Sequence, residues 1–315
     1  MKKLVLINKE TKTAYCPERC SCCSYMDLYY SNSLINRFLR KMILSFKLPG
    51  KKLVLNKWTE EIENSDEIIV FDTGNAVELI RWIKKRAPGK RVILWYWNPV
   101  VNSIPVEKAV LSGAELWSFD PNDCKKYGLR YNSQYYMREN LLDPDEERKE
   151  PKDVFYVGKD KGRSETLYSL KQVFDANGIT YNFHLVQYNK QGSSPYFEYK
   201  ALLKYHEVLQ NIASSKAIID LVSEEQSGLT IRPIEALLYK KKLITDMKGI
   251  SAFKIYNPKN VFILGADNIE DLPDFIHSPF DEKDYDSLCE FYLMEAWLER
   301  FDLENSWFDY NDQLE

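Results

Sequence analysis

Several features are missing from this sequence of 315 residues, and each absence excludes a class of protein. No stretch approaches the roughly 18 consecutive apolar residues that a membrane-spanning helix needs. The basic start, MKKLVLINKE, has no small-residue cleavage site and reads as a strand, not a secretion signal. Positive charge is not in excess, because 43 Lys and Arg face 47 Asp and Glu for a net charge of −4. We therefore expect a cytoplasmic protein with reduced cysteines and no nucleic-acid partner.

Two patterns typical of catalytic sites are missing as well. No G-x-G-x-x-G turn follows the first predicted strand, which disfavours a dinucleotide-dependent oxidoreductase. All three histidines, His184, His206 and His277, lie in the second half, so the first half cannot supply a histidine base. What is present is ordinary globular composition, with 44% hydrophobic, 29% charged and 14% aromatic residues. That composition supports two sizeable hydrophobic cores.

Charge is distributed unevenly along the chain. Residues 1–57 carry 12 basic and 3 acidic side chains, whereas residues 266–315 carry 2 basic and 16 acidic ones. Divided at residue 150, the net charge is +5 in the first part and −9 in the second. The first part could therefore face an anionic surface.

Apolar strands alternate with amphipathic helices along the whole chain. We predict strands at residues 4–7, 52–55, 68–71, 91–97 and 115–119, and helices at 34–46, 75–87 and 106–112. A charged segment with two prolines, residues 143–152, is the predicted linker. After it we predict strands at 154–157, 179–186, 217–222, 242–245 and 261–264, and helices at 165–176, 197–213, 231–239 and 284–301. This α/β pattern predicts two doubly wound, Rossmann-like domains, residues 1–150 and 151–315, that face a cleft.

The clearest candidate site lies in DLVSEEQSGLTIRPIEALLYKKKLIT, residues 220–245. Ser227 or Thr230 can cap a helix whose first backbone N–H groups would bind phosphate oxygens. Arg232 lies in the first turn of that helix, and Glu235 could accept hydrogen bonds from a ribose diol. The alternative is an ordinary strand–loop–helix connection with a capping residue.

This segment, with Asp220 upstream, resembles the donor-domain signature of bacterial GT-B glycosyltransferases, in particular those of lipopolysaccharide-core and capsular polysaccharide biosynthesis. FYVGKDKGR (155–163) resembles the first strand and loop of the same domain, and IIVFDTGN (68–75) and WYWNP (95–99) resemble strand ends of the acceptor domain. The resemblance implies a nucleotide-sugar donor on residues 151–315 and an acceptor on residues 1–150. It also implies a C-terminal helix that crosses back to the first domain, and no cofactor besides the substrate.

The resemblance also implies roles for single residues. Glu235 matches the glutamate that holds the ribose, whereas Glu225, ten positions earlier, departs from the family's spacing. The donor would be bound by Ser227, Gly228, Thr230, Arg232, Lys159, Lys161 and Arg163. Basic side chains and a helix N-terminus would hold the diphosphate without a metal ion. The alternative for the three cations at 159–163 is a solvated basic turn. Asp143-Pro144-Asp145 has the Asp-x-Asp form of metal-dependent relatives, but no apolar strand precedes it, and we read it as accidental.

A catalytic base would have to come from a carboxylate of the first half of the chain. Inverting transfer needs a group that deprotonates the acceptor hydroxyl. Asp72, at the end of an apolar strand, is the best candidate, and Asp120 is the second. Either carboxylate could instead cap a helix or a turn. A retaining enzyme would need no such base.

Two further segments have alternative interpretations. Cys16, Cys20, Cys22 and Cys23 lack the paired C-x2-C spacing of structural zinc sites, so we expect free thiols and no metal. The apolar stripe over residues 34–48 is interleaved with Arg37, Arg40, Lys41 and Lys47. Such a helix suits peripheral contact with an anionic membrane, and the alternative is a core-packed helix with a solvated basic face.

The sequence therefore predicts a metal-independent glycosyltransferase that moves a sugar from a nucleotide-sugar to a cell-surface polysaccharide or lipid-linked acceptor. We expect it in the cytoplasm, at the inner face of the cell membrane. The alternative is a non-catalytic two-domain α/β protein that closes on a small ligand.

Overall fold

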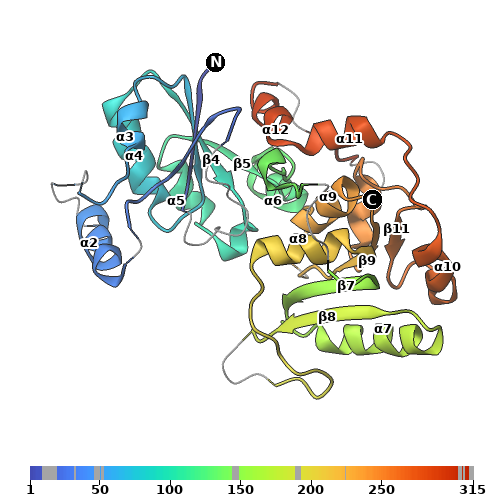
Figure 1. The fold of residues 1–315 in the computed structure, drawn as a ribbon. Coiled ribbons are helices and arrows are strands. Elements are labelled where there is room, and N and C mark those ends of the chain that lie inside the picture. Colours follow the sequence, from blue (N-terminus) through green and yellow to red (C-terminus); the bar gives the residue numbers. More distant parts are fainter. Residues whose placement is uncertain are drawn as a thin grey trace. The chain divides into compact units, whose positions relative to one another are not determined.

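The computed structural model describes residues 1–8, 20–31, 33–45, 50, 53–143, 149–188, 193–223, 225–303, 307 and 309–311. The chain forms two compact units (Figure 1). The first unit comprises Met1–Ser133, Met137–Asn140 and Met294–Phe308, and the second comprises Gln134–Tyr136, Leu141–Leu293 and Asp309–Glu315. The segment with the last helix thus belongs to the first unit, as the resemblance implied. The main crossing between units falls after Asn140 and not at residue 150.

The first unit is built on a six-stranded sheet in the order β2-β1-β3-β4-β5-β6. Its strands are β1 (Lys3–Ile7), β2 (Ser24–Asp27), β3 (Glu67–Phe71), β4 (Arg91–Tyr96), β5 (Glu115–Ser118) and β6 (Arg130–Tyr131). Its helices are α2 (Leu34–Ser45), α3 (Trp58–Glu61), α4 (Ala76–Arg86), α5 (Val106–Val110), α6 (Pro121–Tyr127) and α12 (Met294–Arg300). All neighbouring strands are parallel, and β1 and β3 are buried along their whole length. Continuous apolar runs such as LVLI and IIVF are typical of strands covered on both faces.

The second unit is built on a five-stranded parallel sheet in the order β11-β10-β9-β7-β8. Its strands are β7 (Lys152–Lys159), β8 (Tyr181–Val186), β9 (Ser215–Asp220), β10 (Lys242–Thr245) and β11 (Val261–Ile263). Its helices are α7 (Ser164–Ala176), α8 (Tyr205–Ala213), α9 (Ile231–Leu238), α10 (Leu272–His277) and α11 (Tyr285–Tyr292). Its core joins apolar side chains of β7, β8 and β9 to those of α7 and α10, among them Val154, Phe174 and Ile276.

The two sheets share one topology, which determines where each can bind a ligand. In both sheets, the strand that comes first along the chain lies between the second and the third strands of the chain. The direction of the connections therefore reverses beside this first strand. This reversal falls between β1 and β3 in the first unit and between β7 and β9 in the second. Ligands of open parallel sheets bind outside the carboxyl ends of the strands at such a switch point. The residues that follow β3, β7 and β9 are therefore the candidates for binding and chemistry.

The helix α12 is held on the first unit by aromatic packing. The Trp297 ring centroid lies 5.1 Å from that of Trp95 and 4.7 Å from that of Phe301. The Phe301 ring in turn lies 4.8 Å from Trp117, edge to face. Each of these side chains is almost fully buried. Edge-to-face aromatic pairs of this kind add specific stabilisation to the burial of their area.

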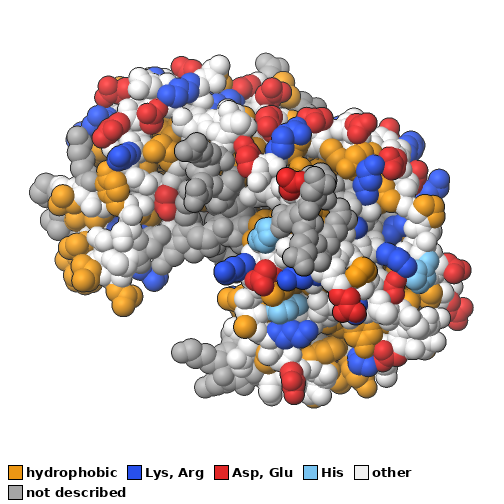
Figure 2. All heavy atoms as spheres, in the orientation of Figure 1, with side chains coloured by type: hydrophobic (Ala, Val, Ile, Leu, Met, Phe, Trp, Pro, Cys, Tyr) orange, Lys and Arg blue, Asp and Glu red, His pale blue; other side chains and the backbone are white. Residues whose placement is uncertain are grey.

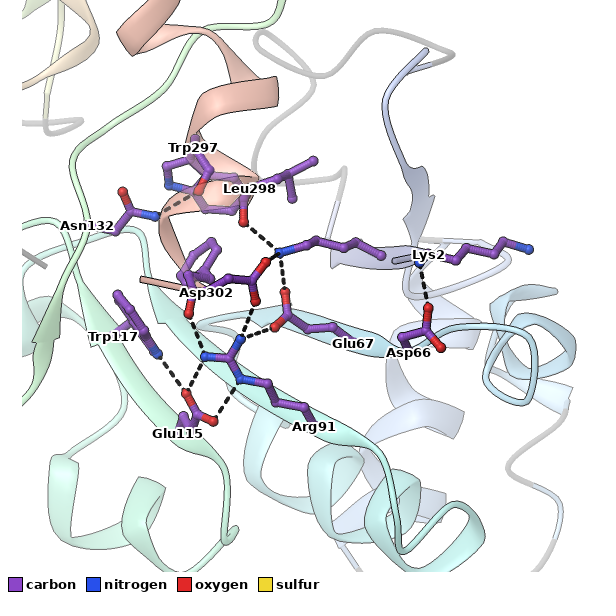
Figure 3. Close-up of polar contacts among 12 residues, drawn as sticks. Lys2, Asp66, Glu67, Arg91, Glu115, Trp117, Asn132, Trp297, Leu298 and Asp302 are labelled. Carbon is purple, nitrogen blue, oxygen red and sulfur yellow. Dashed lines mark hydrogen bonds and ion pairs between the residues drawn. The ribbon is translucent and has the colours of Figure 1, made fainter. Parts of the chain in front are cut away.

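An ionic network at the amino ends of the strands holds the end of α12 as well (Figure 3). The network contains the first residues of four strands, Lys3, Glu67, Arg91 and Glu115. Asp302, which follows α12, pairs with Lys3 and Arg91. Glu67 is completely buried and pairs with both Lys3 and Arg91, which explains why a charge is tolerated there. The network lies at the amino ends of the strands, whereas ligands bind at the carboxyl ends. We therefore assign it a structural role.

Three predicted elements were wrong. Residues 53–55 form no strand, and Leu55 makes only an isolated bridge to Tyr29. Residues 197–204 are not helical, because Lys200 bridges to Val186 and α8 begins only at Tyr205. The predicted last helix is divided into two helices, α11 and α12, because Leu293 between them is extended and bridges to Tyr136.

Among the described residues, no helix combines the length and the apolar character that crossing a bilayer requires.

Candidate active site

The loop after β7 is a tight turn built around a buried aspartate. Asp160 Oδ1 accepts a hydrogen bond from the Ser164 backbone N–H (2.9 Å), and Oδ2 accepts one from the Tyr199 hydroxyl (2.6 Å). Lys161 and Gly162 follow with φ of 43° and 85°, both in the left-handed region. Glycine adopts this conformation without steric cost. The turn places Arg163 at the start of α7, beside the carboxyl end of β7.

Arg163 lies against the backbone of β7, where there is no room for another side chain. Its guanidinium donates to the Lys159 carbonyl (3.4 Å). A Cβ atom on Gly158 would lie 3.4 Å from Arg163 Nη1 and 2.7 Å from Tyr156 Oη. Burial raises the pKa of Tyr156, and the positive charge of Arg163 opposes that shift. Glycine at position 158 is therefore a steric requirement for this arrangement of Tyr156 and Arg163.

A chain of hydrogen bonds joins the end of β9 to the start of α9. The Thr230 hydroxyl donates to Asp220 Oδ2 (2.7 Å) and accepts from the Arg232 backbone N–H (3.1 Å). Thr230 is thus the N-cap of α9, as the sequence suggested. Burial raises the pKa of Asp220 to about 6, against the Thr230 hydrogen bond and the charges of Arg232 and Arg163, which lower it. The two arginines therefore act on one buried carboxyl group at the switch point between β7 and β9.

The raised pKa of Asp220 leads to a prediction about stability and pH. A carboxyl with a native pKa near 6 and an unfolded pKa near about 3.9 favours the folded state most when it is protonated. The free energy of unfolding of the wild type, relative to Asp220→Asn, should fall by about 2 to 3 kcal/mol as pH rises from about 4 to about 7. Urea denaturation of both proteins across this range measures the difference. Parallel pH profiles would show that Asp220 has an ordinary pKa in the folded protein.

Glu235 lies on the first turns of α9, and its carboxylate is already fully engaged. It is completely buried, Oε1 accepts from the Tyr205 hydroxyl (2.6 Å), and Oε2 pairs with Arg232. The Tyr205 hydroxyl also lies 3.2 Å from that of Tyr136. Because Glu235 is completely buried, a ribose hydroxyl could reach its carboxylate only if side chains around it moved. The ribose-holding role of Glu235 stays a prediction, and in this structure Glu235 orients Arg232 and Tyr205.

The other predicted donor residues lie in the same two loops. Ser227 is half-buried and Gly228 is buried, with its carbonyl accepting from the Gln226 side chain (2.9 Å). Lys159 and Lys161 are exposed, and the Lys161 ammonium lies 5.3 Å from the Tyr188 ring centroid. Glu225 is exposed in the loop before Ser227. The structure therefore brings Arg163, Asp220, Thr230, Arg232 and Glu235 together and leaves the two lysines at the rim.

Asp72 follows β3, at the switch point of the first unit. Its Oδ1 accepts from the Trp97 backbone N–H (3.0 Å), and its Oδ2 accepts from the Ser103 hydroxyl (2.5 Å) and the Asn98 amide (3.2 Å). The side chain is half-buried. The carboxylate is thus held in one position, with a hydroxyl beside it, at the edge where a parallel sheet binds its ligand.

Asp120 has a different environment, two strands away from the switch point. It follows β5, is 1% exposed, and is the N-cap of α6. Its Oδ1 accepts from the Asp123 backbone N–H (3.1 Å). This geometry matches the capping alternative, so of the two predicted bases Asp72 is the better placed for chemistry.

Three residues of the second unit that the sequence analysis did not single out contribute to its site. Asp160 and Asp246 each follow a strand directly, a position that could have drawn attention to them. Asp246 Oδ1 accepts from the Val222 backbone N–H (2.8 Å), which fixes the start of the loop after β9. Tyr205, the partner of Glu235, comes from a distant helix, and no local pattern indicates it.

Comparison with known proteins supports the fold. No protein-family model matches the sequence, and no curated protein does either. Among solved structures, AviGT4, a glycosyltransferase involved in avilamycin A biosynthesis, is similar with a TM-score of 0.54 and 11% identity, over 96% of each chain. Sucrose-phosphate synthase from Thermosynechococcus elongatus has a TM-score of 0.50 and 11% identity, over 95% of this chain and 87% of its own. The lipopolysaccharide outer core galactosyltransferase WaaB is similar at a TM-score of 0.44 and 15% identity, over 89% of this chain and 83% of its own.

The similarities to AviGT4 and to sucrose-phosphate synthase, together with the two parallel sheets, show the fold. The chain has the two-domain Rossmann-like fold of the GT-B glycosyltransferases. The fold class predicted from the sequence is thereby confirmed, including the return of the last helix to the first unit. At this level of identity the comparisons concern the fold alone, and a fold of this kind hosts more than one activity.

Proposed function

We propose that the protein is a glycosyltransferase that uses a nucleotide-sugar as its donor. The observation that supports this most strongly is the position of Arg163 and Arg232 around Asp220, at the carboxyl ends of β7 and β9. A doubly wound sheet binds phosphorylated ligands at this edge, and guanidinium groups are suited to paired phosphate oxygens. In the first unit, Asp72 would deprotonate the acceptor hydroxyl as its oxygen attacks the sugar, with the nucleoside diphosphate leaving.

The donor diphosphate would be neutralised by protein cations and not by a metal ion. Arg163 and Arg232 are anchored, whereas Lys159 and Lys161 are exposed at the rim of the site. Arg163 is held by the backbone of β7, and Arg232 by the buried Glu235. Anchored arginines lose less conformational entropy when they bind an anion. Pro144 and Asp145 of the Asp143-Pro144-Asp145 sequence lie outside the described residues.

Thermal unfolding with a panel of nucleotide-sugars tests this function. At fixed salt and with EDTA present, we expect nucleotide-sugars of one nucleotide class to raise Tm. In a turnover assay, the enzyme should transfer the sugar of the same donor to an acceptor or to water. No increase with any donor would contradict the proposal. Binding without turnover would favour the non-catalytic alternative. Activity that EDTA abolishes and Mg²⁺ restores would refute metal independence.

The helix α2 supports an acceptor at a membrane surface. Four of its apolar side chains are exposed, with Leu34 at 82%, Ile35 at 74%, Phe38 at 64% and Leu39 at 43% of their area (Figure 2, orange side chains over α2), whereas Ile43 and Leu44 are buried. The core-packed alternative describes Ile43 and Leu44, but it does not account for the four exposed side chains. Monomeric soluble proteins rarely expose a contiguous apolar patch unless it binds something. Because Arg37 and Lys41 are exposed on the same helix, we propose that α2 binds an anionic membrane that carries a lipid-linked acceptor.

Phe38→Ser should weaken binding to vesicles that contain anionic lipid by roughly tenfold. Burying one large apolar side chain is worth about 1.5 to 3 kcal/mol, and part of that is recovered by neighbouring contacts. Co-sedimentation with vesicles measures the affinity. Leu202→Ser, which removes a side chain that is 75% exposed in the second unit, is the matched control. Equal binding by both variants would exclude α2 as the contact surface, and the wild-type affinity should fall as salt is raised.

A further inference from the structure

Three cysteine thiols converge in the first unit, directly before β2. The Sγ atoms of Cys20, Cys22 and Cys23 all lie within 4.8 Å of one another. Cys20 Sγ is 3.1 Å from Cys22 Sγ and 3.6 Å from Cys23 Sγ. All three thiols are free, with Cys22 exposed and the other two half-buried. The sequence spacing argued against a metal site here, but the turn brings the three sulfur atoms to one point.

The separations between the sulfur atoms match those around a tetrahedral metal ion. With a metal–sulfur bond of about 2.3 Å, two thiolates of one tetrahedral ion lie about 3.8 Å apart. The distances from Cys20 Sγ, 3.1 and 3.6 Å, need only small adjustments to reach that value. A disulfide has an S–S bond of about 2.05 Å and would use two of the sulfur atoms and leave the third unpaired. A single metal ion engages all three.

The cluster is held in place by residues distant in sequence, and one of them is a further soft donor. Met294 Sδ, at the start of α12, lies 3.8 Å from Cys20 Sγ and is buried. Glu139 Oε1 accepts from both the backbone N–H and the hydroxyl of Ser21, at 2.9 and 3.0 Å. The segment is therefore fixed between α12 and Glu139, which lowers the ordering cost of binding an ion. Thiolate and thioether sulfur together select soft metal ions.

We propose that Cys20, Cys22 and Cys23 form a trithiolate site for a soft d¹⁰ metal ion, Zn²⁺ or Cu⁺. Each thiol that is still protonated releases its proton to solvent as its sulfur bonds the ion, so affinity falls with falling pH. The exposed Cys22 provides the path of entry. The bound ion closes the turn before the edge strand β2 and stabilises the first unit. The site lies before β2, at the amino end of the sheet, whereas Asp72 follows the carboxyl end of β3. Cys16 lies outside the described residues.

Metal content of the reduced, full-length protein tests the site. The protein is stripped with a chelator, dialysed anaerobically against Zn²⁺ or Cu⁺, desalted and analysed by mass spectrometry for bound metal. We expect one ion per chain in the wild type and a loss of at least tenfold in affinity in Cys20→Ser/Cys22→Ser/Cys23→Ser. Cys289→Ser, which removes a half-buried thiol on α11, is the control and should retain the ion. Retention of Zn²⁺ alone, Cu⁺ alone or both supports the site and identifies its ion.

A spectroscopic measurement keeps the test independent of how well the triple variant folds. Co²⁺ added to the reduced wild type should give thiolate-to-metal charge-transfer absorption that one equivalent of Zn²⁺ removes. A wild type that retains neither metal and shows no such absorption would overturn the proposal. A triple variant that folds and binds the ion as tightly as the wild type would overturn it as well.

Discussion

Replacing Asp72 with Asn is expected to lower the rate of sugar transfer by roughly 10²–10⁴-fold, the usual contribution of a general base. Asn keeps an oxygen that can accept from the Trp97 backbone N–H, the Ser103 hydroxyl can rotate to accept from the new amide, and the Asn98 amide can flip to present its oxygen. The fold of the first unit should therefore be preserved while the proton acceptor is lost. Nucleotide binding should be unchanged, because the proposed donor residues belong to the second unit.

The matched control for this variant is Asp123→Asn. Asp123 is another half-buried carboxylate near the carboxyl edge of the same sheet, and it accepts from the Val100 backbone N–H (2.7 Å). Steady-state kinetics of both variants should show a loss of kcat in Asp72→Asn alone. If Asp72→Asn retains wild-type kcat, the base is a different group, or the reaction is a retaining one that needs no base.

Arg163→Ala is expected to weaken binding of the nucleoside diphosphate by about tenfold to a hundredfold. A hydrogen bond to a charged group contributes about 1.5 to 3 kcal/mol, and each 1.4 kcal/mol is a factor of ten in affinity. The effect should be large because Arg163 is held against β7, next to Gly158, and does not have to be ordered on binding. Calorimetry with the nucleotide that gives the largest increase in Tm measures it.

Lys171→Ala is the control for the loss of positive charge. Lys171 is an exposed cation of α7 that pairs with Asp175 one turn further on. An exposed pair of this kind contributes little to stability, so the variant should fold and bind like the wild type. Equal losses of affinity in both variants would indicate a general electrostatic effect and not a defined site at Arg163.

The sequence predicted the fold where apolar runs and helical periods are long. Strands such as β1 and β3 are almost entirely apolar, and a parallel sheet covered on both faces requires such runs. Prediction failed where pairing over long distances decides the structure. The predicted last helix is divided at Leu293, which is extended because it bridges to Tyr136. No local sequence pattern indicates that Tyr136 is the partner of Leu293.

The site was predictable in part for the same reason. Arg163, Thr230 and Asp72 directly follow strands or begin helices, so the topology alone places them at the ligand-binding edge. The partners that determine their chemistry were not predictable. Tyr205, which donates a hydrogen bond to Glu235, lies on another helix. The burial that raises the pKa of Asp220 depends on the packing of the whole second unit. Likewise, the spacing of the cysteines gave no indication that their sulfur atoms converge.

The proposed function requires that a nucleotide-sugar binds at the carboxyl ends of β7 and β9. Hydrogen exchange of the full-length protein, with and without a saturating nucleotide-sugar, tests it most directly. We predict slower exchange of backbone amides in residues 160–163 and 227–232, with Arg163→Ala reducing that protection. Protection confined to other segments, or none in these two loops under conditions where calorimetry shows binding, would contradict the account.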